Sequence, residues 1–259
     1  MMKSAFLLLI LMVIWFGSPL HAQDEIARLL QIAESDYKAG DWSAASSGFE
    51  AVIDRGVSDS AIYVNLGHAY AQQGRVGLAL LNYRRAQRLV PRDPEILGYM
   101  ASIIADRRDQ SLPDNSWLDQ LYRLTADLVT EDELGGMTLL MWNVTFAVVV
   151  VWQSGQVNIR LKSSLRLIVL GLAALVIPLL LLLGVRIYVD SAMPDAIVTV
   201  EQTTVRSGPA SIYMDFFDVY EAAELRVLEV KDDWALVELS EGRLGWLPTR
   251  DIQLVRTSR

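Results

Sequence analysis

Two long apolar runs dominate the hydrophobic pattern of the chain. They occupy residues 134–152 and 167–187, each close to the roughly 20 apolar residues that a helix needs to cross ~30 Å of hydrocarbon. A buried helix of a soluble protein normally keeps a polar stripe, whereas residues 135–152 carry no charge, and Asn143 and Thr145 are the clearly polar side chains in the middle of that run. The pattern predicts transmembrane helices over residues 131–152 and 167–187.

The segments around these runs predict how the helices are oriented. The connecting loop, residues 153–166, contains Arg160, Lys162 and Arg166 and no acidic residue, as expected for a cytoplasmic loop. Residues 1–22 combine Lys3, a short apolar run and Ala22, the pattern of a secretory signal peptide whose cleavage site stays open. Cleaved or not, this segment directs export of the polar residues after it, so both soluble parts are expected on the outer side of the membrane.

The polar segment before the first run repeats with a period of 34 residues, over residues 26–59 and 60–93. Both units resemble tetratricopeptide (TPR) repeats, the second at every usual position. The second unit carries Tyr63, Leu66, Gly67, Tyr70, Gly74, Ala79, Tyr83, Ala86 and Pro91. Two repeats cannot close a core alone, so a TPR domain over residues 23–130 is expected to add capping helices at 94–106 and 117–129. The last of these could instead lie on the membrane surface.

Short β-like runs replace the helical pattern after residue 196 and predict a small β-barrel. The predicted strands are residues 197–200, 203–205, 225–230, 235–239 and 245–247. Residues 205–210, Trp234 and the pair Gly245-Trp246 resemble a bacterial SH3-like (SH3b) domain over residues 196–259. Trp234 and Trp246 are expected to pack in the barrel core, because the barrel has few other large apolar groups; ligand contact is the alternative.

The residue types present exclude several classes of function. The chain has no cysteine, and His68 is the only histidine beyond the signal peptide, so a His/Cys metal centre or a histidine-based triad is not expected. Residues 23–133 carry eleven basic and eighteen acidic side chains, which would repel a phosphate backbone, so nucleic acid is not expected as a partner. No nucleotide-binding loop or paired-carboxylate site is present, and we expect a protein that is not an enzyme and has no cofactor.

The order of these segments, with Thr130-Glu131-Asp132-Glu133 as a capping box at the start of the first membrane helix, resembles the BatE family of aerotolerance operon proteins. This resemblance implies an inner-membrane setting beside von Willebrand A-domain membrane proteins and a MoxR-type ATPase. Two hypotheses remain: a scaffold that binds protein partners in the cell envelope, or a sensor that binds peptidoglycan through the SH3b domain.

A groove on the first helices of the repeats is the predicted binding site of the TPR domain. Its inward positions are expected to be Leu30, Glu34, Tyr37, Val64, Asn65, His68, Glu95 and Tyr99. TPR domains that grip a terminal carboxylate use lysines and asparagines at such positions, and here only Asn65 fits. Glu34 and Glu95 would repel an acid, so the ligand is expected to be a peptide or helix that is not read through its carboxylate.

Overall fold

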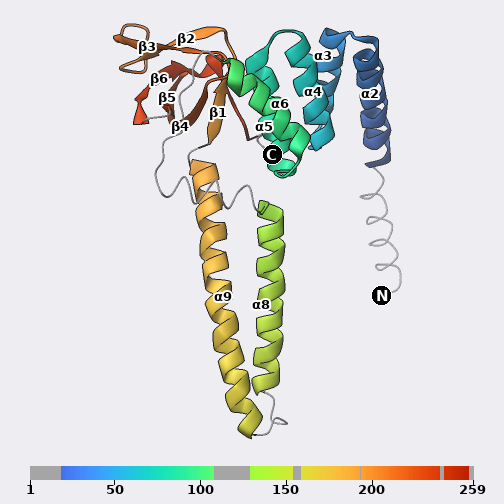
Figure 1. The fold of residues 1–259 in the computed structure, drawn as a ribbon, viewed down its shortest axis with the longest axis vertical. Coiled ribbons are helices and arrows are strands. Elements are labelled where there is room, and N and C mark those ends of the chain that lie inside the picture. The colour runs from blue at the N-terminus through green and yellow to red at the C-terminus, as the bar shows by residue number, and fades with distance from the viewer. Residues whose placement is uncertain (1–18, 108–128, 154–158, 193, 240–241, 257–259) are drawn as a thin grey trace, which may run out of the picture.

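The structure is a computed structural model, which describes residues 19–107, 129–153, 159–192, 194–239 and 242–256. In these segments an array of helices and an antiparallel sheet lie side by side, and two long helices extend away from both (Figure 1). Most of the predicted signal peptide, residues 1–18, and most of the predicted helix at 117–129 lie outside the described residues.

The helical array begins with α2 (Pro19–Ala39) and α3 (Trp42–Ile53), followed by α4 (Ser60–Gln72), α5 (Val76–Leu89) and α6 (Pro94–Asp106). The glycines that end its helices and the aspartates that cap them recur 34 residues apart. Gly40 and Gly74 both adopt a positive φ, of 77° and 74°, which a residue with a Cβ rarely adopts. Asp59 and Asp93 both cap the following helix through their side chains. The array is therefore built from repeated helix pairs, as the period in the sequence predicted.

Small residues bring the helices of a pair together. A Cβ on Gly67 of α4 would lie 2.6 Å from the ring of Tyr83 on α5, so the tyrosine ring occupies the space that glycine leaves. Ala79 and Ala86 of α5 are completely buried in the same cluster as Phe49, Leu66 and Tyr83. Helix α6 adds buried Ile96 and Met100, which confirms that residues 94–106 form a helix covering this core.

The sheet has seven strands, all paired antiparallel, in the order β3-β2-β6-β5-β4-β1-β7. The strands are β1 (Asp195–Val198), β2 (Gln202–Arg206), β3 (Asp215–Tyr220), β4 (Glu224–Lys231), β5 (Trp234–Leu239), β6 (Leu244–Pro248) and β7 (Ile252–Leu254). Strands β3 and β7 were not among the predicted ones. The core is formed mainly by Val, Leu and Ala side chains, including Val198, Val205, Val237 and Leu247.

The helical array and the sheet share one hydrophobic cluster. Ile197, Ala222 and Val255 from the sheet belong to the buried core of the helices, while Ala196 and Val198, on either side of Ile197, belong to the core of the sheet. Strand β1 therefore presents alternate side chains to two cores. The backbones come close together at Gly77, where a Cβ would lie 2.4 Å from the carbonyl oxygen of Val198.

Polar contacts surround this shared cluster. The backbone N–H of Gly77 donates to Glu221 Oε1 at 2.8 Å, and Arg84 forms an ion pair with Glu224 at 2.6 Å. The guanidinium of Arg85 donates to the carbonyl oxygen of Leu254 at 3.0 Å. All of these contacts join residues that precede the two apolar helices to residues that come after them, so the two soluble parts pack as one unit.

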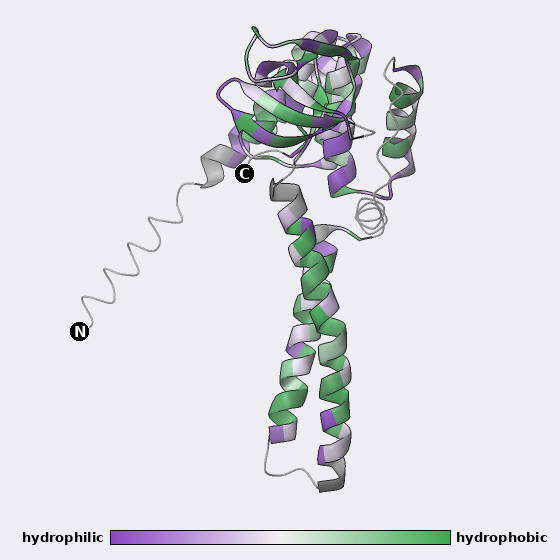
Figure 2. Ribbon diagram, turned by 90° about the vertical axis from the view of Figure 1, so that its left-hand side faces the viewer, coloured by the Kyte–Doolittle hydropathy of each residue, from purple (hydrophilic) through white to green (hydrophobic). Residues whose placement is uncertain are grey.

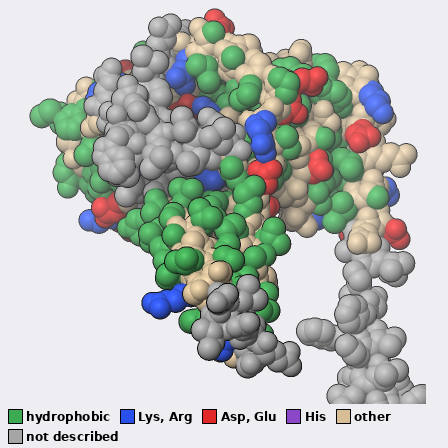
Figure 3. Space-filling model, turned by 60° about the horizontal axis from the view of Figure 1, so that its bottom comes forward, with side chains coloured by type: hydrophobic (Ala, Val, Ile, Leu, Met, Phe, Trp, Pro, Cys, Tyr) green, Lys and Arg blue, Asp and Glu red, His purple; other side chains and the backbone are tan. Residues whose placement is uncertain are grey.

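The two apolar helices are α8 (Glu131–Gln153) and α9 (Ile159–Ala192). Both are long and apolar enough to cross a membrane, over Asp132–Gln153 and Lys162–Tyr188, and they lie side by side with hydrophobic residues along most of their length (Figure 2). From below, hydrophobic side chains cover the pair (Figure 3). Helix α9 extends beyond the predicted residues 167–187 at both ends. The prediction of a loop over residues 153–166 was wrong from Ile159 onward, because polar residues ended the apolar run without ending the helix.

Candidate functional site

The predicted groove residues lie on three helices of the array. Helix α2 carries Leu30, Glu34 and Tyr37, helix α4 carries Val64, Asn65 and His68, and helix α6 carries Glu95 and Tyr99. Leu30, Tyr37, Val64 and Tyr99 are partly buried against the helical core. Asn65 and His68 are half-buried, and Glu34 and Glu95 are exposed. The set thus combines a half-buried floor with two exposed carboxylates.

His68 is the residue through which the three helices meet. Its Nδ1 shares a hydrogen bond of 3.1 Å with the hydroxyl of Tyr37 on α2, and its ring lies edge-on to Tyr99 of α6 at a centroid distance of 4.3 Å. Tyr37, His68 and Tyr99 are 31 residues apart in sequence at each step, three fewer than the repeat period, so each contact joins residues about one helical turn apart in their repeats. The structure therefore brings together the central three residues of the predicted set.

Tyr83 of α5 completes this cluster, although the sequence marked it only as a position of the TPR pattern. Its ring stacks on Tyr99 at 5.4 Å and lies edge-on to His68 at 5.6 Å. On the other side, Tyr37 contacts Trp42 edge-on at 5.3 Å. The aromatic cluster, defined as Trp42, Tyr37, His68, Tyr83 and Tyr99, forms a continuous row across the array. The TPR spacing that marked Tyr83 could not show that its ring also reaches this row.

Burial determines the ionisation of the cluster. It lowers the pKa of His68, and the nearby carboxylate of Glu95 opposes this effect. It also raises the pKa values of Tyr37 and Tyr83. His68, Tyr37 and Tyr83 are therefore uncharged near pH 7, and the carboxylate of Glu95 lies close enough to His68 to act on its ring. Aromatic faces and carboxylates together suit a cationic group, through cation–π and Coulomb attraction.

The prediction that Trp234 and Trp246 belong to the core of the sheet was wrong. Both are only half-buried, whereas Ala235 and Leu247, the next residues of their strands, are completely buried. Side chains alternate between the two faces of a strand, so both indoles lie on the face away from the core. Aliphatic side chains fill the core instead, and large aromatic groups are not required there.

The two indoles lie near each other on that outer face. Trp246 of β6 is paired with Leu236 of β5 and with Arg206 of β2. The guanidinium of Arg206 lies 6.0 Å from the centre of the Trp234 ring and 3.3 Å from Asp215. The connection from β2 to β3 adds further apolar surface. Its exposed members are Ile212, Tyr213, Met214 and, on β3, Phe216.

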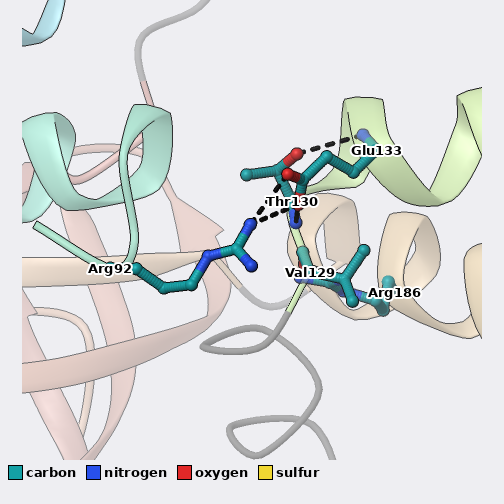
Figure 4. A network of polar contacts seen from close by, with 5 residues as sticks. All are labelled: Arg92, Val129, Thr130, Glu133 and Arg186. Carbon is teal, nitrogen blue, oxygen red and sulfur yellow. Dashed lines mark hydrogen bonds and ion pairs between the residues drawn. The ribbon is translucent and has the colours of Figure 1, made fainter.

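A polar network joins the helical array to the two apolar helices (Figure 4). Thr130 and Glu133 form the predicted capping box, with Glu133 N donating to Thr130 Oγ1 at 3.0 Å and Thr130 N donating to the Glu133 carboxylate at 2.9 Å. Arg92, between α5 and α6, donates to both oxygens of the same carboxylate, at 2.7 and 2.9 Å. Arg186 of α9 donates to the carbonyl oxygen of Val129 at 2.8 Å. The capping prediction is thus confirmed, and Arg92 links the capping carboxylate to the helical array.

No protein-family model, no curated protein and no solved structure matches this chain. Among the residues that the structure describes, there is also no group of three or more His, Asp or Glu side chains placed to hold a metal ion. The aromatic cluster, the outer face of the sheet and the two apolar helices are therefore the features of the molecule that indicate a function.

Proposed function

We propose that the chain is a membrane-anchored scaffold without enzymatic activity, whose TPR and SH3b domains bind protein partners outside an inner membrane. The observation that carries this proposal is the contact between the two soluble parts, typified by the hydrogen bond from Gly77 to Glu221. Such a contact requires both parts to lie on the same side of the membrane, so α8 and α9 form a hairpin. The unit formed by the two parts then offers two binding surfaces on a single anchor.

The assignment of the helical array to the TPR class is supported by its repeated signals. The turn glycines Gly40 and Gly74 and the caps Asp59 and Asp93 recur at the TPR period of 34 residues. The space left by Gly67 is filled by Tyr83, as the TPR pattern implies. In this class the first helices of successive repeats line the binding groove, and in this chain those helices carry Tyr37, His68 and Tyr99 of the aromatic cluster.

The assignment of the sheet to the SH3b class is supported by its antiparallel strands and by its glycine-tryptophan pair. Gly245 is buried on β6, and a Cβ there would lie 2.2 Å from the Cγ1 of Val205, so only glycine fits. A barrel of this class would anchor the array close to the membrane, because β1 comes directly after α9.

The expected setting is an inner membrane, with both domains on the outer side. The predicted signal peptide and the basic residues between the apolar runs support this orientation. The resemblance to the BatE family adds von Willebrand A-domain membrane proteins and a MoxR-type ATPase as proposed components of the same system.

Single cysteines test this arrangement, because the natural chain contains none. In intact cells, Ser47→Cys on α3 and Ser211→Cys on the β2–β3 connection are expected to react with a membrane-impermeant maleimide, since both positions are exposed. Ser163→Cys, near the start of α9, is expected to react only after permeabilisation. Labelling of Ser163→Cys in intact cells would overturn the proposed orientation.

Site-directed crosslinking tests the scaffold function in the same cysteine-free background. A photoreactive reagent attached to Glu95→Cys, beside the aromatic cluster, is expected to capture envelope proteins. Attached to Ser47→Cys, on the second helix of the first pair, the same reagent serves as the matched control. Identical products from both positions would argue against a binding groove.

The outward indoles favour a second function, binding of peptidoglycan by the sheet. Sugar-binding sites commonly offer exposed aromatic faces with a few polar groups, and Trp234, Trp246 and Arg206 form such a combination. Sedimentation of the solubilised full chain with purified peptidoglycan tests this function. Binding that is lost in Trp246→Ala but kept in Tyr99→Ala would support the sensor over the scaffold.

A further inference from the structure

Helix α8 has two different faces along its apolar span. The face toward α9 contains buried Leu134 and Thr138 and half-buried Thr145. The opposite face, which we call the outer face of α8, is exposed throughout. It is formed by Gly136, Leu139, Asn143, Phe146 and Val150. In Figure 1, the only helix running alongside α8 in the span is α9, so nothing in the described part of the chain covers this outer face.

Asn143 is at the centre of that face and at the middle of the span Asp132–Gln153. Its Nδ2 donates a hydrogen bond of 2.7 Å to the carbonyl oxygen of Leu139, one turn earlier in the same helix. The hydroxyls of Thr138 and Thr145 make equivalent bonds of 2.7 Å to their own helix. Such a bond uses the single donor of a hydroxyl. A carboxamide keeps a second N–H and an acceptor oxygen.

These remaining groups of Asn143 need a partner inside the membrane. Hydrocarbon supplies no hydrogen bonds, so an exposed carboxamide at mid-span is unfavourable unless another helix satisfies it. Polar side chains of this kind join membrane helices to one another. The polar side chain therefore points to a helix that covers the outer face of α8.

The spacing of the outer face is that of a seam between two supercoiled helices. Gly136, Asn143 and Val150 recur at intervals of seven residues, with Leu139 and Phe146 between them, so these five side chains occupy the a and d positions of a heptad pattern. A single asparagine at an a position aligns two helices in one register and favours a two-stranded pair. Gly136 has open space around it, which allows a second helix to approach closely.

We propose that this second helix is α8 of another copy of the chain, with the two Asn143 carboxamides bonded to each other. Two copies inserted with the same topology have parallel α8 helices, so their Asn143 side chains lie at the same depth. A carboxamide offers both a donor and an acceptor, so identical side chains complement each other across a two-fold axis. The proposal rests on the membrane insertion of α8 under the proposed function, and it makes the scaffold a dimer with two sets of binding surfaces.

Co-purification of two differently tagged copies from membranes tests the dimer. The natural chain is expected to co-purify, and Asn143→Leu is expected to reduce the recovered partner at least tenfold. Asn143→Gln keeps a carboxamide and should retain most of the pairing. Thr145→Val, which removes a polar group at the same depth on the face toward α9, is the matched control and should not change it. Equal recovery of the natural chain and Asn143→Leu would overturn the proposal.

Cysteine crosslinking of the purified full chain in phosphatidylethanolamine and phosphatidylglycerol vesicles identifies the occupant. Under mild oxidation, Val150→Cys on the outer face is expected to yield a product of twice the 28.9 kDa chain mass, while Val149→Cys, half-buried on the other side, should not. If Val150→Cys forms no crosslinked dimer in vesicles but crosslinks to another protein in cells, a different membrane protein covers α8. Extraction of the natural chain by alkaline carbonate is the separate outcome that would contradict membrane insertion itself.

Discussion

Gly77 donates its backbone N–H to the carboxylate of Glu221 at 2.8 Å, although both apolar helices separate the two residues in sequence. The same glycine lies so close to β1 that a Cβ would come within 2.4 Å of the carbonyl oxygen of Val198. The array and the sheet therefore meet through backbone contact as well as through side chains, and together they form a single unit.

A methyl group at this contact is expected to destabilise that unit. Gly77→Ala should reduce the free energy of unfolding by about 1–3 kcal/mol, because the rigid backbone of β1 must shift. Gly98→Ala on α6 is the matched control, since nothing lies within 4 Å of its Cβ, and it should be neutral or stabilising by up to ~1 kcal/mol. Thermal unfolding of the detergent-solubilised chain, followed by circular dichroism, measures both. Equal melting temperatures would mean that the array and the sheet separate readily.

The aromatic cluster is expected to prefer basic over acidic peptides. Glu95→Lys should weaken binding of a basic peptide at least tenfold, or about 1.4 kcal/mol, because it replaces an attractive charge beside His68 by a repulsive one. Glu229→Lys, an exposed change of the same charge on β4, is the control. Fluorescence anisotropy with matched Lys-rich and Glu-rich peptides measures the effect. Selective binding of an acidic C-terminal peptide, lost in Asn65→Ala, would contradict this specificity.

The depressed pKa of His68 predicts a pH-dependent stability. Burial favours the neutral ring, so the unfolded chain binds more protons than the folded chain between the lowered pKa and the usual value of about 6.5. His68 therefore stabilises fully above pH 6.5, and its contribution is lost as the pH falls through this window.

Denaturant unfolding at several pH values from 7.5 to 5 tests this contribution. The difference in stability between the natural chain and His68→Gln should shrink as the pH falls. Burial raises the pKa values of Asp195 and Glu221, so these two groups make the folded chain more stable as the pH falls further. Both chains contain them, so their contributions cancel when the two stabilities are subtracted. A difference that stays constant across the range would show that His68 is accessible to water.

Adjacent residues of β6 should respond very differently to truncation. Leu247 is completely buried in the sheet core, and Leu247→Ala is expected to cost about 2–5 kcal/mol. Trp246 is half-buried on the outer face, so Trp246→Ala should leave the sheet folded and cost clearly less. Thermal unfolding of the two variants in the full chain makes the comparison. A larger loss of stability for Trp246→Ala than for Leu247→Ala would show that the indole packs in the core.

Local chemistry allowed several elements to be predicted from the sequence. The capping box of Thr130 and Glu133 marked the start of α8, because its two hydrogen bonds act within one helical turn. Helix α6 begins at Pro94, where it was predicted. The 34-residue period and the two apolar runs were equally visible, since each is a regular pattern along the chain. The groove positions on α2, α4 and α6 came from the same period.

Long-range packing decided what the sequence left open. Strand β3 buries only Val219 fully, too weak a signal to mark a strand without its partner β2, and β7 has only three residues. Trp234 and Trp246 lie on the outer face because the next residues of their strands, Ala235 and Leu247, fill the core, and the sequence does not show which of two adjacent apolar residues points inward. The sequence alone determined the helical repeats and the apolar hairpin, because periodicity and hydrophobicity encode them. Only the tertiary structure joined Gly77 to Glu221, added Tyr83 to the aromatic cluster and turned Asn143 away from α9, since each depends on contacts or orientations set by packing between elements.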